Sequence, residues 1–398
     1  MVFGAQVVSY LGDWFAFVAL AGLVEDVTDS RFLVSLVLVS MTIPGLFMSP
    51  IAGSFADRFD RRRILMAVSV LQAFAALLLL LHSAAGIWIT FVSQCLIAGL
   101  ASFVGPSTSA SVPNLVDNED DLRKTNALFG STWGVMLAVG AALGGLFAAV
   151  FGRNAAFIAN AVSFVVAALL FAGVRRPMQS ERTQNSNKGR VRPLADMKEA
   201  INVAKKDPVI LALLCSKMTF AVGAGIVSQL AVLASNVFNV GDSGRGLLIG
   251  VRGIGSGLGP IIGARIAGRD MAKLLKVCGY AGIVFAVCYV GAALSPFIGM
   301  AAVFIALAHL SGGAQWTLST LGLQMESPDH VRGRVMAGDM AMVNTMIGFT
   351  SILAGLTSQF VGVRPAIIIF SAAAAVASVV YLIATAGIIR RLRTSQQH

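Results

Sequence analysis

Two motifs of the same kind lie 210 residues apart in this chain, each at the end of an apolar segment and just before a cluster of positive charge. The first runs from Ser49 to Gly53 and the second from Gly259 to Gly263. Two further landmarks keep nearly the same offset: Asp121-Leu122-Arg123 matches His330-Val331-Arg332, and Gly145 matches Gly355. Three matches in register indicate a duplicated chain, a pattern typical of membrane folds built from two similar halves.

The composition requires that many apolar side chains face lipid. Hydrophobic residues make up 57% of the 398 residues, charged residues make up 12%, and the mean hydropathy is +0.80. This apolar excess is too large for a soluble core. A membrane-crossing helix needs about 20 apolar residues, and the sequence predicts twelve, near residues 3–24, 33–55, 64–81, 86–108, 126–150, 154–174, 209–234, 246–266, 273–294, 297–322, 335–360 and 364–389.

The predicted fold class is an all-α membrane protein with twelve transmembrane helices in two pseudo-symmetric six-helix halves. The first half covers residues 1–174, a cytoplasmic linker covers 175–208, and the second half with a short tail covers 209–398. With both termini in the cytoplasm, the inner loops and tail hold 24 of the 30 lysines and arginines. Because such residues favour the cytoplasmic side, we expect a multi-pass protein of the bacterial inner (plasma) membrane with both termini inside.

The linker changes character along its length. It begins as a polar run and then shows apolar residues at three- and four-residue steps, which predicts an amphipathic helix on the membrane surface. These residues are Leu194, Met197, Ile201 and Ala204. Asp207 and Pro208 then begin the seventh span, because proline is tolerated in a first helical turn.

No metal, cofactor or nucleic-acid site is predicted. The four cysteines, Cys95, Cys215, Cys278 and Cys288, lie in apolar spans without metal-like spacing. The run Gly253 to Gly259 imitates a dinucleotide fingerprint, but it lies in an apolar helix, so we interpret it as close helix packing. The net charge of +11 fits topology and attraction to anionic lipid headgroups.

The turn after the second span carries a signature. Residues 53–63 read Gly, three residues, Asp-Arg, two residues and then basic residues, which resembles the major facilitator superfamily between its second and third helices. The resemblance implies that fold, and a switch that locks helix two to the start of helix eleven. The residues that it assigns are Gly53, Asp57, Arg58, Arg61 and Arg62 in the turn, with Arg332, Arg334 and Asp339 opposite. The family usually has glycine where Asp60 stands, so this turn is expected to differ.

Three further stretches resemble the subgroup of macrolide-efflux and enterobactin-exporter proteins. They are Pro113 to Val116 with Asp121 to Leu128, Val331 to Val335, and Pro193 to Pro208. The fifth span carries Gly140, Gly144 and Gly145 in a pattern similar to the fifth-helix motif of proton-coupled antiporters in this superfamily. Ala141 replaces the usual proline there, and generic small-residue helix packing is the alternative interpretation.

Four ionisable residues fall inside predicted spans: Asp13, Lys217, Arg252 and Asp339. A charge at this depth costs at least about 2.5 kcal/mol, so each needs a partner, water or a function. Asp13 is the deepest carboxylate and the first candidate for proton coupling; a structural ion pair is the alternative. Lys217 is predicted either to pair with Asp13 across the cleft or to reach the inner headgroups.

The other polar residues inside the predicted spans have several interpretations. Arg252 is predicted to point outward, to pair with Asp13 or to bind an anionic cargo group. Asp339 is predicted to pair with loop arginines such as Arg58 or Arg334. His309 is the second proton-coupling candidate, although a lone histidine among apolar residues is more often only hydrogen-bonded. Possible cargo contacts are Trp14, Phe17, Gln94, Phe220, Gln315 and Trp316.

The resulting functional hypothesis is a monomeric secondary active transporter, a proton-coupled exporter of amphipathic small molecules or drugs by alternating access. The expected partners are a small-molecule substrate, protons and the lipid bilayer. The alternative cargo is an anionic metabolite, siderophore or lysolipid, which is favoured if Lys217 and Arg252 face the cavity. A membrane enzyme or a non-transporting sensor is the minority alternative, because the histidines form no reactive group at one membrane surface.

Overall fold

The computed structural model describes residues 1–116, 119–178, 205–267, 270–327 and 329–395, with most of their side chains. Every regular element in these ranges is a helix, and twelve helical segments among them are long and apolar enough to cross a membrane. The predicted all-α fold with twelve spans is therefore confirmed. The predicted amphipathic helix of the linker lies outside the described residues.

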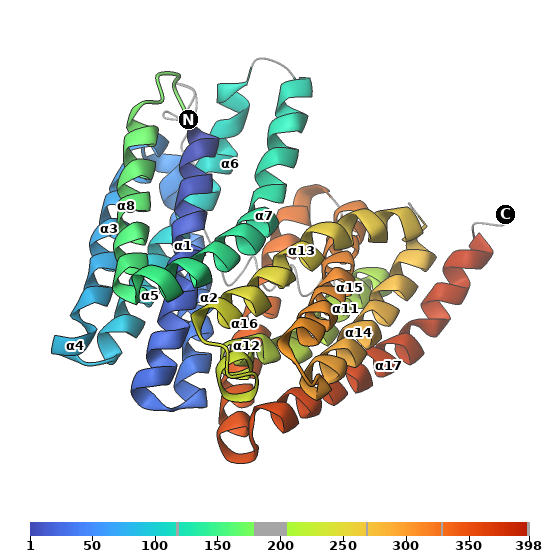
Figure 1. The fold of residues 1–398 in the computed structure, drawn as a ribbon. Coiled ribbons are helices and arrows are strands. Elements are labelled where there is room, and N and C mark those ends of the chain that lie inside the picture. The colour runs from blue at the N-terminus through green and yellow to red at the C-terminus, as the bar shows by residue number, and fades with distance from the viewer. Residues whose placement is uncertain (117–118, 179–204, 268–269, 328, 396–398) are drawn as a thin grey trace. The chain divides into compact units, whose positions relative to one another are not determined.

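The first six spans are formed by α1 to α8 (Figure 1). A short 3-10 helix, η1 (Leu78–Leu81), extends α3, and α5 and α6 together form the fourth span. The bounds are α1 Val2–Thr28, α2 Arg31–Arg58, α3 Arg61–Leu77, α4 His82–Ala85, α5 Trp88–Ala101, α6 Val104–Leu115, α7 Glu119–Phe151 and α8 Arg153–Ala172.

The last six spans begin with a helix of mixed type. α11 (Pro208–Ala224) continues through the 3-10 helix η2 (Gly225–Gln229), α12 (Leu230–Val232) and the π-helix η3 (Leu233–Val237). The remaining bounds are α13 Asp242–Ala267, α14 Met271–Leu294, α15 Ile298–Glu326, α16 Asp329–Val361 and α17 Val363–Ser395.

Close contacts divide the chain into two compact units. Unit 1 contains Met1–Val191 and Asn239–Gly250, and unit 2 contains Arg192–Phe238 and Val251–His398. The units follow the two halves except at α13, whose first turns belong to unit 1 and whose remainder belongs to unit 2. A single helix is thus shared between the two packing units.

Aspartates begin several helices. The Asp207 carboxylate accepts from the backbone N–H groups of Val209 (2.8 Å) and Ile210 (3.1 Å), with Pro208 in the first turn, so the predicted start of the seventh span is confirmed. Asp60 caps α3 by accepting from the Arg63 N–H at 2.9 Å, at a φ of −58°. This backbone needs no glycine, which explains how an aspartate stands where the family usually has glycine.

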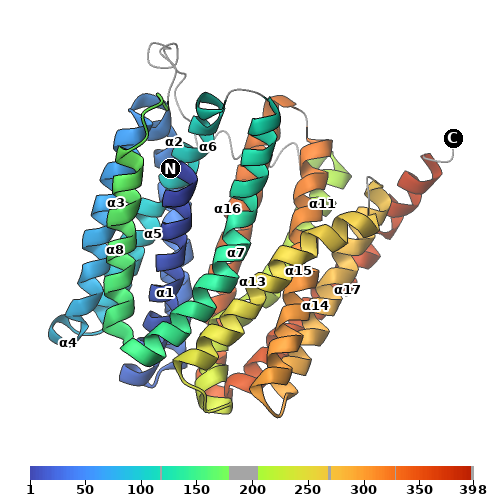
Figure 2. The same ribbon diagram turned by 45° about the horizontal axis from the view of Figure 1, so that its top comes forward.

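Unit 1 is organised around α1 and α8. α1 packs along α7 and α8, and α3 packs along the other side of α8, as Figure 2 shows for α3 and α8. At the end near the N-terminus, Leu65 of α3, Phe171 of α8 and Val2 of α1 share one apolar cluster. A second cluster joins Ala76 to Phe164. These contacts fix the depth of α1 in the unit.

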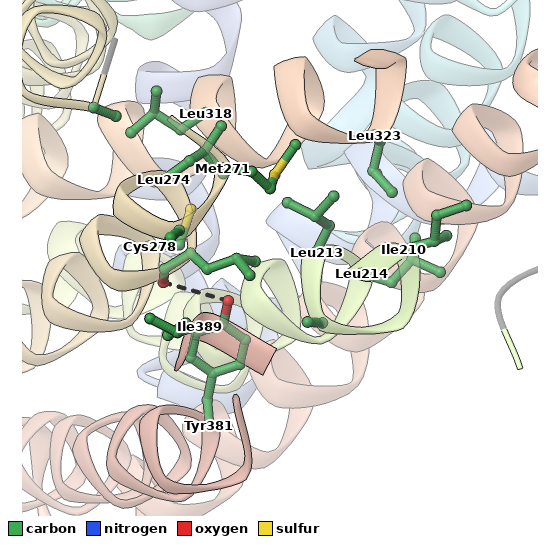
Figure 3. Close-up of a cluster of buried hydrophobic side chains, with 14 of the residues drawn as sticks. Ile210, Leu213, Leu214, Met271, Leu274, Cys278, Leu318, Leu323, Tyr381 and Ile389 are labelled. Atoms are coloured by element: carbon green, nitrogen blue, oxygen red, sulfur yellow. Dashed lines mark hydrogen bonds between the residues drawn. The ribbon is translucent and has the colours of Figure 1, made fainter. Parts of the chain in front are cut away.

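Unit 2 is organised around α14, which packs along both α15 and α17. Figure 3 shows the apolar cluster that joins these helices to α11, including Leu213, Leu274, Leu318 and Tyr381. The Tyr381 hydroxyl donates to the Leu275 carbonyl at 3.4 Å. The cluster joins α11 to α15, and these two helices carry Lys217, His309 and Gln315.

Candidate functional site

Asp13 lies within α1 and is half-buried. Its helix is held close to its neighbours by small residues. Gly140 and Gly144 of α7 lie against Trp14 and Phe15, where an added methyl group would be only 2.9 Å from Trp14 Cβ and 2.7 Å from Phe15 Cα. Among the residues that the structure describes, Asp13 forms neither an ion pair nor a hydrogen bond. A membrane-embedded carboxylate without a cation is better tolerated with a proton than without one.

The other predicted contacts of unit 1 are buried. Trp14 and Phe17 are 5% and 6% exposed and pack edge to face, with ring centroids 5.5 Å apart. Gln94 of α5 is 7% exposed. Gly145 lies where α7 meets the first turns of α13, because a side chain there would clash with the backbone of Gly246. The three glycines of the fifth span therefore contact two different helices.

Lys217 of α11 has its acidic partner in its own unit. Its ammonium group forms a short ion pair with Asp339 of α16 and donates to Thr320 Oγ1 at 2.8 Å. Both Lys217 and Asp339 are 1% exposed. The structure thus gives Lys217 the partner Asp339 in place of Asp13 or the headgroups, and the pairing of Asp339 with a loop arginine remains a prediction. The side chains of Arg58 and Arg334 lie outside the described residues.

The physical reason for this correction is depth. Lys217 lies nine residues into α11 and Asp339 ten residues into α16. Two opposite charges at matched depth neutralise each other at lower cost than either reaching water. One oxygen of the pair, Asp339 Oδ1, is buried and has no hydrogen-bond partner among the described residues.

Arg252 of α13 meets His309 of α15. The Arg252 Nε donates to His309 Nε2 at 3.2 Å, and the Tyr289 hydroxyl of α14 lies 2.8 Å from the same nitrogen. His309 is 3% exposed and Tyr289 is fully buried. Gly255 makes this contact possible, because its missing side chain lets α13 approach the α15 backbone at Ala306 and His309. The glycine run that imitates a dinucleotide fingerprint is therefore a helix-packing surface.

Aromatic rings connect these two polar groups. Phe220 packs edge to face against Trp316 (centroids 6.3 Å apart) and against Phe285 (4.9 Å), and its ring lies 6.5 Å from that of His309. The Lys217 ammonium lies 5.0 Å from the Trp316 ring centroid. Phe220, Trp316 and Arg252 are each partly exposed. Unit 2 thus brings aromatic rings and two cationic side chains close together on α11, α13 and α15.

Gln315 forms hydrogen bonds between two packed helices. Its Nε2 donates to the Ser216 carbonyl at 2.6 Å and to Thr219 Oγ1 at 2.8 Å, so it links α15 to α11. The side chain is fully buried. A structural link therefore accounts for its Nε2 donor, whereas Oε1 is buried without a hydrogen-bond partner among the described residues.

Part of the predicted switch is described. Arg61 is 6% exposed and donates to the Met178 carbonyl at 3.1 Å, and Arg62 donates to the Ala172 carbonyl at the end of α8. These contacts anchor the start of α3 within unit 1. The side chains of Gly53, Asp57, Arg58, Arg332 and Arg334 lie outside the described residues, and the locking role remains a prediction.

Sequence reasoning missed a network of charges in unit 1 at the end of α1 remote from the N-terminus. Arg245 of α13, 2% exposed, pairs with Glu25 (2.8 Å) and with Asp242 (2.6 Å). Arg153 of α8 pairs with Asp26 (2.7 Å) and with Asp242 (3.0 Å). The available signal was that these charges lie between predicted spans in a chain with few charges.

The network has a clear structural logic. Glu25 and Asp26 lie at the C-terminal end of α1, where a helix disfavours negative charge, so they need cations. Gly22 makes room for these side chains, because a side chain at this position would overlap Asp242, Arg245 and Arg153.

A separate pocket of about 670 Å³ lies near Phe3, Val112 and Phe129. None of the predicted site residues lines it.

Comparison with known proteins agrees with the helical plan. The family described as transmembrane secretion effector matches residues 1–394. The chain belongs to this family of the major facilitator superfamily. It is a multi-pass membrane transporter and not an enzyme.

Relatives of the transporter are bacterial. The putative bacilysin exporter BacE of Bacillus amyloliquefaciens is 23% identical, over 91% of this chain and 88% of its own. The staphyloferrin A transporter of Staphylococcus aureus is 24% identical, over 91% and 89%. Macrolide efflux protein A of Streptococcus pyogenes is 23% identical, over 54% and 52%.

A solved structure shares the fold of this transporter. It is a bacterial homolog to the human lysosomal transporter Spinster, in an inward-facing and occupied conformation. The TM-score is 0.76 at 13% identity, with 96% of this chain and 95% of that chain covered. At this identity the similarity concerns the fold alone.

Proposed function

We propose that this transporter is a proton-coupled exporter of amphipathic small molecules, acting as a monomer in the bacterial plasma membrane with both termini in the cytoplasm. The observation that carries the proposal is Asp13, a carboxylate within the first span for which the described residues offer no cation. Such a group takes up and releases a proton without breaking an ion pair. Asp339, in contrast, is bound to Lys217.

Two other observations support the direction and the cargo class. The relatives named above include a putative bacilysin exporter and a macrolide efflux protein, so export is the common theme of their names. The aromatic surface of Phe220 and Trp316 offers rings to an apolar cargo body. The orientation rests on the excess of lysine and arginine in the loops assigned to the inside.

The direct test is transport in inverted membrane vesicles with an imposed pH gradient. A panel of fluorescent dyes and antibiotics first identifies a cargo whose uptake into the vesicles depends on the gradient. Asp13→Asn then mimics the protonated carboxylate permanently, so gradient-driven transport should fall by about tenfold or more, while exchange of cargo without a gradient persists.

The matched control is Asp29→Asn, the same chemical change one residue beyond α1. Asp29 has a left-handed backbone (φ 49°), which asparagine tolerates, so transport should stay at the wild-type level. If Asp13→Asn retains gradient-driven transport, Asp13 is not the coupling residue and His309 becomes the next candidate. If the wild-type protein responds to no gradient with any member of the panel, proton-coupled export is wrong.

A further inference from the structure

The cation in the middle of α13 has no acidic partner among the described residues. Arg252 lies within a predicted span, and no described carboxylate lies within ion-pair distance of its guanidinium. Lys217, a cation of unit 2 that also lies within a span, is neutralised by Asp339. The described part of unit 2 therefore leaves the positive charge of Arg252 uncompensated at membrane depth. Such a charge is costly unless an anion or water meets it.

The guanidinium is held by one of its edges only. Its Nε donates to His309 Nε2, and both terminal nitrogens remain without a described partner. The support is rigid, because Gly255 and Gly259 of α13 lie directly on the α15 backbone at His309 and Leu310. The two terminal nitrogens of a guanidinium form a planar fork that matches a carboxylate or phosphate group. The packing thus fixes one edge and leaves the fork available.

The protonation of His309 follows from its donors. An arginine Nε always carries a hydrogen, so His309 Nε2 must accept, and the ring is neutral with its proton on Nδ1. The Tyr289 hydroxyl competes for the same lone pair from 2.8 Å. When Arg252 turns toward a ligand, Tyr289 can keep His309 satisfied. The release of Arg252 therefore leaves His309 Nε2 with a hydrogen-bond partner.

Apolar surface adjoins the charge. The ring of Phe220 lies 6.5 Å from that of His309 and 6.3 Å from that of Trp316, and both Phe220 and Trp316 are partly exposed. Gly312 makes room for Phe220, because a side chain there would lie 2.7 Å from its ring. All these residues belong to unit 2. Arg252, which has no described anionic partner, and the partly exposed rings of Phe220 and Trp316 are together complementary to an amphipathic monoanion.

We propose that Arg252 binds the carboxylate or phosphate-like group of an amphipathic cargo whose apolar body lies against Phe220 and Trp316. His309 and Tyr289 are positioning residues that hold the guanidinium between cargo molecules. This inference rests on the proposed function and specifies its substrate class as soluble amphipathic monoanions. It needs no proton gradient, so binding measurements test it independently of proton coupling.

The experiment uses the full-length protein in nanodiscs of zwitterionic lipid. A series of fluorescent naphthalene and larger aromatic carboxylates is titrated beside the matching carboxamides. Wild-type protein should prefer a carboxylate over its amide by about tenfold or more. Arg252→Gln should abolish this preference and leave amide affinity within about twofold. A wild-type protein that binds no carboxylate, or binds both members of each pair equally, overturns the proposal.

Three controls separate recognition from folding. Arg265→Gln removes an exposed arginine from the same helix and should change neither affinity. Tyr289→Phe removes the second donor to His309 and should weaken carboxylate binding by about threefold with amide binding unchanged. If Arg252→Gln does not fold, Arg252→Lys keeps the charge but not the fork, and should lose most of the preference. An unchanged preference in every folded Arg252 variant refutes the site.

A membrane lipid offers the same chemistry as a soluble anion. The titration is therefore repeated in nanodiscs that contain an anionic phospholipid. A site for soluble cargo binds the carboxylates equally in both lipids. Carboxylate binding that anionic lipid blocks, but that returns in zwitterionic lipid, assigns Arg252 to a lipid headgroup and overturns the proposal.

Discussion

Asp13 in unit 1 and Asp339 in unit 2 are both carboxylates inside membrane spans, and their surroundings are opposite. Asp339 is 1% exposed and bound to Lys217, whereas Asp13 is half-buried and has no described cation. An ion pair inside the membrane must be broken before its carboxylate can change charge. A lone carboxylate changes charge with the arrival or departure of a proton. Depth alone therefore does not identify a coupling residue, because the presence or absence of a cationic partner decides whether the carboxylate can change its charge.

Breaking the Lys217 to Asp339 pair should have the largest effect on stability. Asp339→Leu leaves the buried Lys217 ammonium without an anion and should lower the free energy of unfolding by about 3 to 5 kcal/mol. Adding Lys217→Met removes the stranded charge and should recover most of that loss. Thermal unfolding of the purified proteins measures both. A double variant no more stable than the single variant would show that the pair is not the source of the loss.

The charge network of unit 1 should give an intermediate effect. Arg245→Gln removes the central cation and leaves Glu25 buried, which should cost about 2 to 3 kcal/mol. The cost is smaller than for Asp339→Leu because Asp26, 54% exposed, lies at the edge of the network and admits water. Lys273→Gln, which removes an exposed ion pair with Asp270 at 3.7 Å, should change stability by less than about 0.5 kcal/mol. Equal losses in the two variants would contradict a buried network.

Asp13→Asn should affect stability less than either Asp339→Leu or Arg245→Gln. No partner is stranded, so the free energy of unfolding should stay within about 1 kcal/mol of wild type, and any change should be a gain. The same variant should lose gradient-driven transport. A loss of stability as large as that of Asp339→Leu would reveal a cation bound to Asp13, and the contrast between the two carboxylates would disappear.

The sequence predicts the span pattern well because crossing a membrane imposes a length and an apolar composition that each segment satisfies by itself. The start of α11 is also predictable, because Asp207 and Pro208 mark it by their own local chemistry. The pairing of Lys217 with Asp339 was not, because it depends on the rotational phase of two helices whose residues are 122 positions apart. Lys217 and Asp339 lie at similar distances from the starts of their helices, and this similarity is a signal in the sequence that indicates the pairing.

The unit 1 charge network escaped sequence reasoning for a related reason. Arg153 and Arg245 lie between predicted spans, where a positive charge is informative only about which side of the membrane a loop occupies. Their pairing with Asp26, Glu25 and Asp242 requires three helix ends to meet. Similarly, the role of Gly255 in supporting Arg252 follows from which face of α13 contacts α15. The periodicity of a single helix shows neither which helix ends meet nor which face of α13 contacts α15.

The sharing of α13 between the two units also has a consequence in time. Glu25 and Arg245 are 220 residues apart, so the ribosome inserts the first into the membrane well before it makes the second. At 5 to 20 residues per second, this interval lasts roughly 10 to 45 s. Throughout it the nascent first six helices carry Glu25 at the end of α1 before Arg245, its partner in the folded protein, has been made. The first unit can therefore complete its packing only once the eighth span has been synthesised, so the order of biogenesis differs from the order of the two halves.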